Sequence, residues 1–188
     1  ITDLMNDPFL EMNGMEKLAT IIYTLGEYLR LMVFPHPLTH DYYPYHIPIM
    51  NFGKPGTLIS LALYLGLAYA FFKLWKSKSI YAWSIGFFIA TLSIVSNLVF
   101  PVGSFMNERF IFIPSIAFSL VSAWVLIRHG WNSEKPLFKW GAVALIVLIS
   151  GAYAFKTYTR IPAWKDALSL NGTAAIISPH SDRSNCFM

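Results

Sequence analysis

The residues best suited to chemistry lie in a proline-rich stretch, residues 34–46, that carries three histidines and one aspartate. Proline fixes φ and removes an amide donor, so this stretch is predicted to be an ordered loop. The side chains of His36, His40 and Asp41 could contact a phosphate or sugar hydroxyls, or assist proton transfer. The alternative is an aromatic loop that only packs on its neighbours. No metal site is predicted, because neither a zincin-type helical motif nor a cysteine partner accompanies these histidines.

A second candidate group is the tripeptide Asn107-Glu108-Arg109. Glu108 and Arg109 could simply pair with each other. An arginine also offers a planar, permanently charged fork that suits a phosphate. The two readings stay open at this point, and Arg109 is the residue that distinguishes them.

The elements that must position these residues are apolar helices. Hydrophobic residues make up 55% of the 188 residues and charged residues only 13%, whereas a soluble domain carries about 25% charged residues. The apolar residues form blocks of the length that crosses a hydrocarbon core about 30 Å thick. We therefore predict an all-α, polytopic transmembrane helix bundle with four spanning helices, at 56–75, 80–100, 109–127 and 138–158.

A fifth helix is expected at residues 15–34, where Glu27 and Arg30 interrupt the apolar pattern. Their i,i+3 spacing allows them to pair on one helix face. This helix either spans the membrane or lies along its outer surface as an amphipathic helix. Both options stay open.

The charged loops predict which side of the membrane each segment faces. Cationic loops stay in the cytoplasm, and two loops here are rich in cations: Lys73, Lys76 and Lys78 in one, and Arg128, Lys135 and Lys139 against a single Glu134 in the other. The 35–55 loop, the 101–108 turn and the C-terminal tail are then extracytoplasmic. Since these charges orient helices, nucleic acid is not an expected partner.

The tail combines Trp164 and Leu168 with a helical run and then Pro179. This order resembles the opening helix of a tetratricopeptide repeat. We expect residues 1–158 to form a membrane part and residues 159–188 to form a linker and a truncated first repeat. The chain begins at Ile1 and stops at Met188 within an apparently unfinished helix, which suggests a piece of a longer protein.

These motifs together resemble one family, the tetratricopeptide-repeat transmembrane O-mannosyltransferases, in their bacterial form. That family belongs to the GT-C superfamily of glycosyltransferases, and the resemblance is to its C-terminal membrane half. The motifs that carry it occur in order along the chain: Asn6-Asp7-Pro8-Phe9, residues 25–31, residues 34–42, Asn107-Glu108-Arg109-Phe110 with Pro114-Ser115, and Trp164-Lys165-Asp166.

The resemblance implies transfer of a mannose-like sugar from a polyprenyl-phosphate donor to protein Ser or Thr hydroxyls on the extracytoplasmic face of a bacterial inner membrane. It implies donor-phosphate or substrate contacts from Arg109, Glu108, His36, His40, Asp41 and Tyr42. The catalytic acid of the family lies in an N-terminal part that this chain lacks. No cofactor beyond the lipid-linked donor is expected. The repeats would hold an acceptor or a partner protein.

Two other classes of function compete with this one. A non-catalytic membrane anchor that presents repeats to a partner would share the same helices and tail. A transporter module would place ionisable groups or broken helices near the bilayer midplane, and three of the predicted spans carry no charge there.

Overall fold

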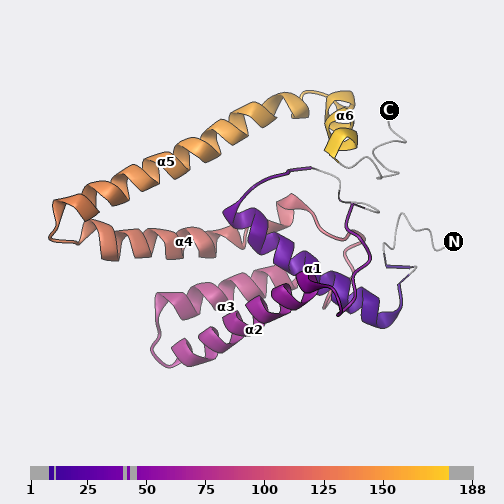
Figure 1. The fold of residues 1–188 in the computed structure, drawn as a ribbon, viewed down its shortest axis with the longest axis horizontal. Coiled ribbons are helices and arrows are strands. Elements are labelled where there is room, and N and C mark those ends of the chain that lie inside the picture. Colours follow the sequence, from indigo (N-terminus) through magenta and orange to yellow (C-terminus); the bar gives the residue numbers. More distant parts are fainter. Residues whose placement is uncertain (1–8, 11, 40–41, 43–45, 178–188) are drawn as a thin grey trace.

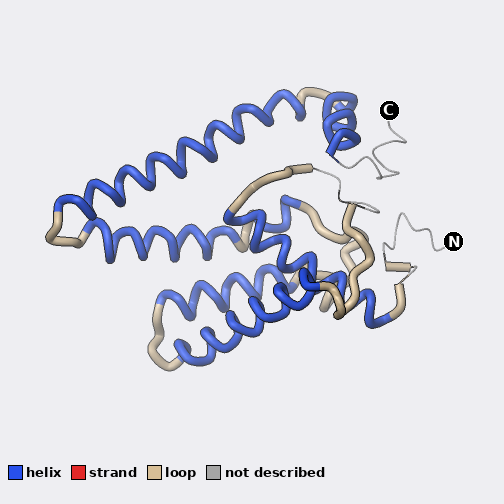
Figure 2. The backbone as a smooth tube through the Cα atoms, viewed as in Figure 1, coloured by secondary structure: helices blue, strands red, loops and turns tan. Residues whose placement is uncertain are grey.

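The computed structural model describes residues 9–10, 12–39, 42 and 46–177. Every regular element within these ranges is helical, and they contain no strand (Figures 1 and 2). The elements in chain order are α1 (Gly14–Val33), α2 (Pro55–Trp75), α3 (Ile80–Ser93), the 3-10 helix η1 (Glu108–Ile111), α4 (Ser115–Leu126), the π-helical turn η2 (Ile127–Trp131), α5 (Pro136–Arg160), the 3-10 helix η3 (Ile161–Trp164) and α6 (Ala167–Ile177).

The core forms where α1 packs on α2 and on the C-terminal half of α3. Leu25, Tyr28 and Leu31 recur at helical spacing on the buried face of α1 and contact a cluster that includes Phe88 and Leu92 of α3. The start of α1 is fixed by a capping box, in which Asn13 and Glu16 exchange hydrogen bonds with each other's backbone amides. Burial of this apolar stripe is the main stabilisation of the fold.

The predicted pairing on α1 is present, since Arg30 Nε donates to Glu27 Oε2 over 2.6 Å. Because both charges lie on the partly exposed side of the helix, α1 has one buried and one polar face. Length and composition do not place α1 among the helices that could span a membrane.

Of the four predicted spans, only two satisfy the length and apolarity needed to cross a membrane. These are α2, at 21 residues, and the continuous helical stretch Pro136–Trp164 formed by α5 and η3. Only 11% and 6%, respectively, of their most apolar windows are buried inside the chain, unlike the core helix of a soluble protein. Most of their apolar side chains therefore lie at the surface of this chain, as in a helix that could cross a membrane.

The other two predicted spans are shorter than expected. α3 ends at Ser93 because the chain then turns, and Asn97 adopts a left-handed conformation with φ 61°. The Asn97 side chain closes that turn, donating to the Ser104 carbonyl and accepting from the Val102 amide, each over 2.8 Å. α4 begins only at Ser115, after η1 and Pro114, and it passes into a π-turn at Ile127.

The helices form two hairpins, α2 with α3 and α4 with α5 (Figure 1). The α2–α3 turn and the α4–α5 turn lie toward the same end of its long axis (Figure 1). The segment between α3 and η1 and helix α6 lie toward the opposite end, and the segment after α1 runs toward that end from the middle of the molecule. α5 packs on η2 near its N-terminus and diverges from α4 along its length (Figure 1), and Tyr153 near its C-terminal end contacts the end of α1.

Candidate functional site

Three segments that are distant in sequence meet beside the C-terminal end of α5. They are the loop after α1, the 3-10 helix η1, and a polar face of α5 on which Tyr153, Lys156 and Arg160 follow one another at helical spacing. Side chains three, four and seven residues apart share one face of a helix. α5 therefore presents a hydroxyl, an ammonium and a guanidinium group in line.

Arg160 joins the other two segments. Its guanidinium donates to the Leu38 carbonyl in the loop and, over 3.4 Å, to Glu108 Oε2 in η1. The side chain of Arg160 is 21% exposed and that of Glu108 is 23% exposed. A partly buried pair of this kind is less screened by solvent than a surface ion pair.

Glu108 is the carboxylate at the centre of the site. Tyr42 Oη donates to Glu108 Oε1 over 3.1 Å, and the Thr39 backbone also hydrogen bonds to this carboxylate. Burial raises the pKa of Glu108 above its ordinary value, and Arg160 with the Tyr42 hydroxyl opposes that rise. Burial raises the pKa of Tyr42, and the adjacent Glu108 charge raises it further by a smaller amount. This phenol therefore remains a hydrogen-bond donor at neutral pH.

The loop is tied to α5 and to α1 by further hydrogen bonds. Lys156 Nζ lies 3.2 Å from His36 Nδ1, and Tyr153 Oη donates to the Met32 carbonyl over 3.1 Å. Arg30 of α1 donates to the His36 carbonyl over 2.6 Å. The proline-rich loop is therefore held from both sides.

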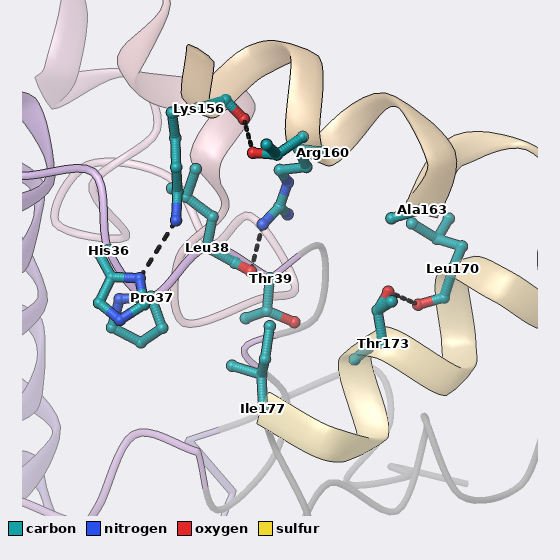
Figure 3. A pocket seen from close by; sticks show the side chains of 12 residues that line it. His36, Pro37, Leu38, Thr39, Lys156, Arg160, Ala163, Leu170, Thr173 and Ile177 are labelled. Atoms are coloured by element: carbon teal, nitrogen blue, oxygen red, sulfur yellow. Dashed lines mark hydrogen bonds between the residues drawn. The ribbon is translucent and has the colours of Figure 1, made fainter. Parts of the chain in front are cut away.

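Two cavities flank this polar face of α5. One, of about 240 Å³, lies between the loop and α6; the other, of about 270 Å³, lies between the loop, Glu108 and Trp164. Leu38, Lys156 and Arg160 line both. Figure 3 shows the first cavity, with His36 and Lys156 on one side and Leu170, Thr173 and Ile177 of α6 across from them.

The structure brings some of the predicted site residues together and leaves Arg109 apart from them. Tyr42 and Glu108 are bonded to each other, and His36 lies beside Lys156 in the same region. Arg109 lies apart: its side chain is exposed and stacks over the Phe110 ring at 5.2 Å, and it lines neither cavity. His40 and Asp41 lie outside the described residues.

Sequence reasoning missed Lys156 and Arg160. Both were read as part of the last apolar helix and the tail that follows it. The signal that could have found them is a pair of cations at i,i+4 spacing, bracketed by Tyr153 and Trp164 at the end of a long apolar helix.

Within the described ranges, no group of three or more His, Cys, Asp or Glu side chains could hold a metal ion.

Comparison with known proteins finds partial similarity to animal protein O-mannosyl-transferases. The human "Protein O-mannosyl-transferase TMTC3" is 34% identical over 80 residues, which are 40% of this chain and 8% of the human protein. The Drosophila "Protein O-mannosyl-transferase Tmtc1" is 28% identical over 116 residues, which are 55% of this chain and 13% of the fly protein. The mouse TMTC3 protein is similar over the same extent as the human one.

The chain therefore matches only a small part of each of these relatives. No protein-family profile matches it, and no solved structure does. Its similarity to proteins that carry this name is consistent with a glycosyltransferase role.

Proposed function

We propose that this chain is part of an integral membrane glycosyltransferase of the GT-C type, which transfers a mannose-like sugar from a polyprenyl-phosphate donor to protein Ser or Thr hydroxyls. The observation that carries the proposal is the similarity to proteins named protein O-mannosyl-transferases. The polar cluster around Glu108 and Arg160 supports it, because it gathers charged groups beside the end of a long, exposed apolar helix.

The position of this cluster suits a lipid-linked donor. If α5 crosses the bilayer, its C-terminal end lies at the level of the lipid phosphates, where Trp164 and Tyr158 are also favoured. Cations held in a partly dry site stabilise the negative charge that builds on a phosphate leaving group. Lys156 and Arg160 would serve in this way, and Glu108 and Tyr42 would hold Arg160 and the loop in place.

The multi-pass topology is part of the proposal. A helix rises about 1.5 Å per residue, so α3 alone is about 20 Å long and needs the turn that follows it to reach across the membrane. The exposed apolar residues just outside α3 and α4, such as Val99, Phe100, Phe112 and Ile113, are suited to a lipid environment. We place the two basic turns in the cytoplasm and α6, as the first helix of a tetratricopeptide-like repeat, outside.

The bacterial inner membrane remains the predicted location, which the animal relatives do not test. The catalytic acid is placed in a part of the protein outside this chain. Glu108 is assigned to positioning and substrate contact, since Arg160 and Tyr42 already occupy its oxygens.

The test compares two matched variants of the complete protein in cells that carry a Ser/Thr-rich acceptor. Glu108→Gln removes the carboxylate of the site, whereas Glu134→Gln makes the same chemical change in the α4–α5 turn at the other end of the molecule. We expect O-linked hexose on the acceptor, measured by mass spectrometry, to fall at least about tenfold with Glu108→Gln and to persist with Glu134→Gln.

Acceptor glycosylation that is absent with the wild-type protein, although the protein reaches the membrane, would contradict the proposal. Retained binding of a partner protein in that case would favour the membrane anchor. Solute movement across the membrane without sugar transfer would favour the transporter.

A further inference from the structure

Lys156 has an unusual set of polar contacts. Its ammonium group contacts the His36 ring nitrogen over 3.2 Å. Among the described residues, the ion pairs are Glu27 with Arg30 and Glu108 with Arg160, and Lys156 acts on Glu108 at longer range, where its charge lowers the pKa of that carboxyl. An ammonium has three hydrogens to donate, so Lys156 can donate to a further group in the cavity that it lines.

The neighbouring cation is already engaged. Arg160 donates to the Leu38 carbonyl and to Glu108, and the Glu108 carboxylate offsets its charge. Lys156 therefore has no carboxylate in direct ion-pair contact at this cavity among the described side chains, and Glu108 acts on it only at longer range.

The opposite wall of the cavity is mostly apolar, and the Thr173 hydroxyl in it donates to the Leu170 carbonyl. α6 contributes Leu170, Ala174 and Ile177 at i, i+4 and i+7 spacing, and Ala163 adds to this wall (Figure 3). The cavity of about 240 Å³ is smaller than the roughly 300–1,000 Å³ of a cleft that encloses a drug-sized ligand. It has room for a small anionic group and the first part of an apolar chain, with the rest extending outside.

We propose that this cavity binds the phosphate group of a lipid, with the phosphate on Lys156 and beside His36 and the start of the lipid chain along the α6 wall. The inference rests on the proposed function in one respect, namely that α5 crosses the membrane and brings Lys156 to its boundary. A lysine is a point-charge donor to phosphate. The exposed Phe155 and Tyr158 on the same turn of α5, at 71% and 75% exposure, provide an apolar approach from the bilayer.

The lipid has two possible sources, the donor of the transfer reaction and an ordinary bilayer phospholipid. Both offer a phosphate on an apolar chain, and the site recognises this shared chemistry. Two pairs of probes separate the sources: farnesyl phosphate against farnesol, and dioleoylphosphatidylglycerol against dioleoylglycerol. Each pair has the same apolar chains and differs in its phosphate head.

The experiment measures binding of these four probes to the complete, delipidated protein in detergent by native mass spectrometry. We expect at least one phosphate-bearing probe to bind more tightly than its partner. Lys156→Gln should weaken that probe about tenfold, the usual effect of losing one charge-assisted hydrogen bond. Lys156→Arg should retain most of the binding.

The matched control is Lys165→Gln, which removes one positive charge from an exposed position that lines neither cavity. It should leave binding of the phosphate-bearing probe unchanged. Preference for farnesyl phosphate identifies a donor-type lipid and preference for phosphatidylglycerol identifies a bilayer lipid; either result supports the site.

Equal binding within both probe pairs would overturn the proposal. Equal weakening by Lys156→Gln and Lys165→Gln would overturn it as well, provided that a thermal denaturation curve shows both variants to be folded. This readout is independent of sugar transfer. A protein that binds the lipid and transfers no sugar would refute the proposed function alone, and one that transfers sugar without this binding would refute the lipid site alone.

Discussion

At the scale of single residues, the site is defined by the balance of forces on the Glu108 carboxylate. Burial disfavours its charge, while the Arg160 guanidinium, the Tyr42 hydroxyl, a backbone bond from Thr39 and the more distant Lys156 charge favour it. Burial is the larger effect, so the pKa of Glu108 lies above the ordinary 4.5. Glu108 therefore depends on Arg160 and Tyr42 to remain charged.

This balance predicts a pH dependence of stability. A carboxyl whose folded pKa is raised binds its proton more tightly in the folded state, so its favourable contribution is full below about pH 4.5 and is lost as the pH rises through the folded value. We expect the melting temperature to fall with rising pH in that window. Arg160→Met should extend the fall to higher pH, because the opposing charge is gone.

The measurement is thermal unfolding in detergent between about pH 4 and about pH 8, with Glu108→Gln as the reference that lacks this titration. Identical pH profiles for the wild type and Arg160→Met would show that Arg160 does not act on Glu108.

Removing the Tyr42 hydroxyl should weaken the same site. Tyr42→Phe deletes the 3.1 Å bond to Glu108 and leaves a partly buried carboxylate short of one donor. We expect a loss of about 1.5 kcal/mol, the usual contribution of a hydrogen bond to a charged group, read as a melting temperature lower by about 3–6 °C. Tyr158→Phe, at a 75% exposed tyrosine, should have no such effect; a similar drop in both variants would contradict this account.

Sequence reasoning found some of these residues and not others, for a physical reason. Glu108, Tyr42 and His36 were named from short motifs and from the family resemblance, and the structure places them close together, while their role in binding stays a prediction. Arg109 was chosen because it follows Glu108 directly, but adjacent residues do not face each other in a helical turn. The arginine that pairs with Glu108 is 52 positions away, and its proximity depends on how α5 folds back.

At the scale of elements, α1 and α2 approach most closely at Gly26 among the glycines of these two helices. A Cβ on Gly26 would come within 2.7 Å of Ser60 Cβ on α2, so these two helix backbones approach closely. We expect Gly26→Ala to lower the free energy of unfolding by about 1–3 kcal/mol, as other overpacking substitutions do. The measurement is again thermal unfolding in detergent.

Gly66 supplies the control. It belongs to α2 as well, but a Cβ there would meet nothing within 4 Å, so Gly66→Ala should cost no stability. Equal losses from Gly26→Ala and Gly66→Ala would show that the α1–α2 contact does not explain the effect, because helix propensity alone would make both alanine variants more stable.

The element boundaries show the limits of hydrophobicity as a predictor. α2 and α5 follow the predicted segments closely, because each is a continuous apolar run that begins at a proline. The ends of α3 and α4 do not, since Asn97 and Pro114 redirect the chain inside runs that remain apolar. A turn residue changes the backbone without changing the hydrophobicity of its surroundings.

At the scale of the whole molecule, the two lysine- and arginine-rich turns lie toward one end of the long axis and the candidate site toward the other (Figure 1). The loop charges alone predicted this grouping. The side of the membrane that each end faces remains a prediction, which labelling can test.

We expect a cysteine at Lys165 to react with a membrane-impermeant maleimide in intact cells, and a cysteine at Ser77 to react only after permeabilisation, in a Cys186→Ser background. Lys165 is exposed beside the site and Ser77 is exposed in the α2–α3 turn. Reaction of the Ser77 position from outside would reverse the topology.

The most direct test of the account is sugar transfer by the complete protein in reconstituted membranes. The assay supplies radiolabelled polyprenyl-phosphate mannose and a peptide that carries Ser and Thr. We predict alkali-labile label on the peptide, reduced about tenfold or more by Glu108→Gln and not by Glu134→Gln. Folded wild-type protein that leaves the peptide unlabelled, or equal labelling by both variants, would contradict the central claim.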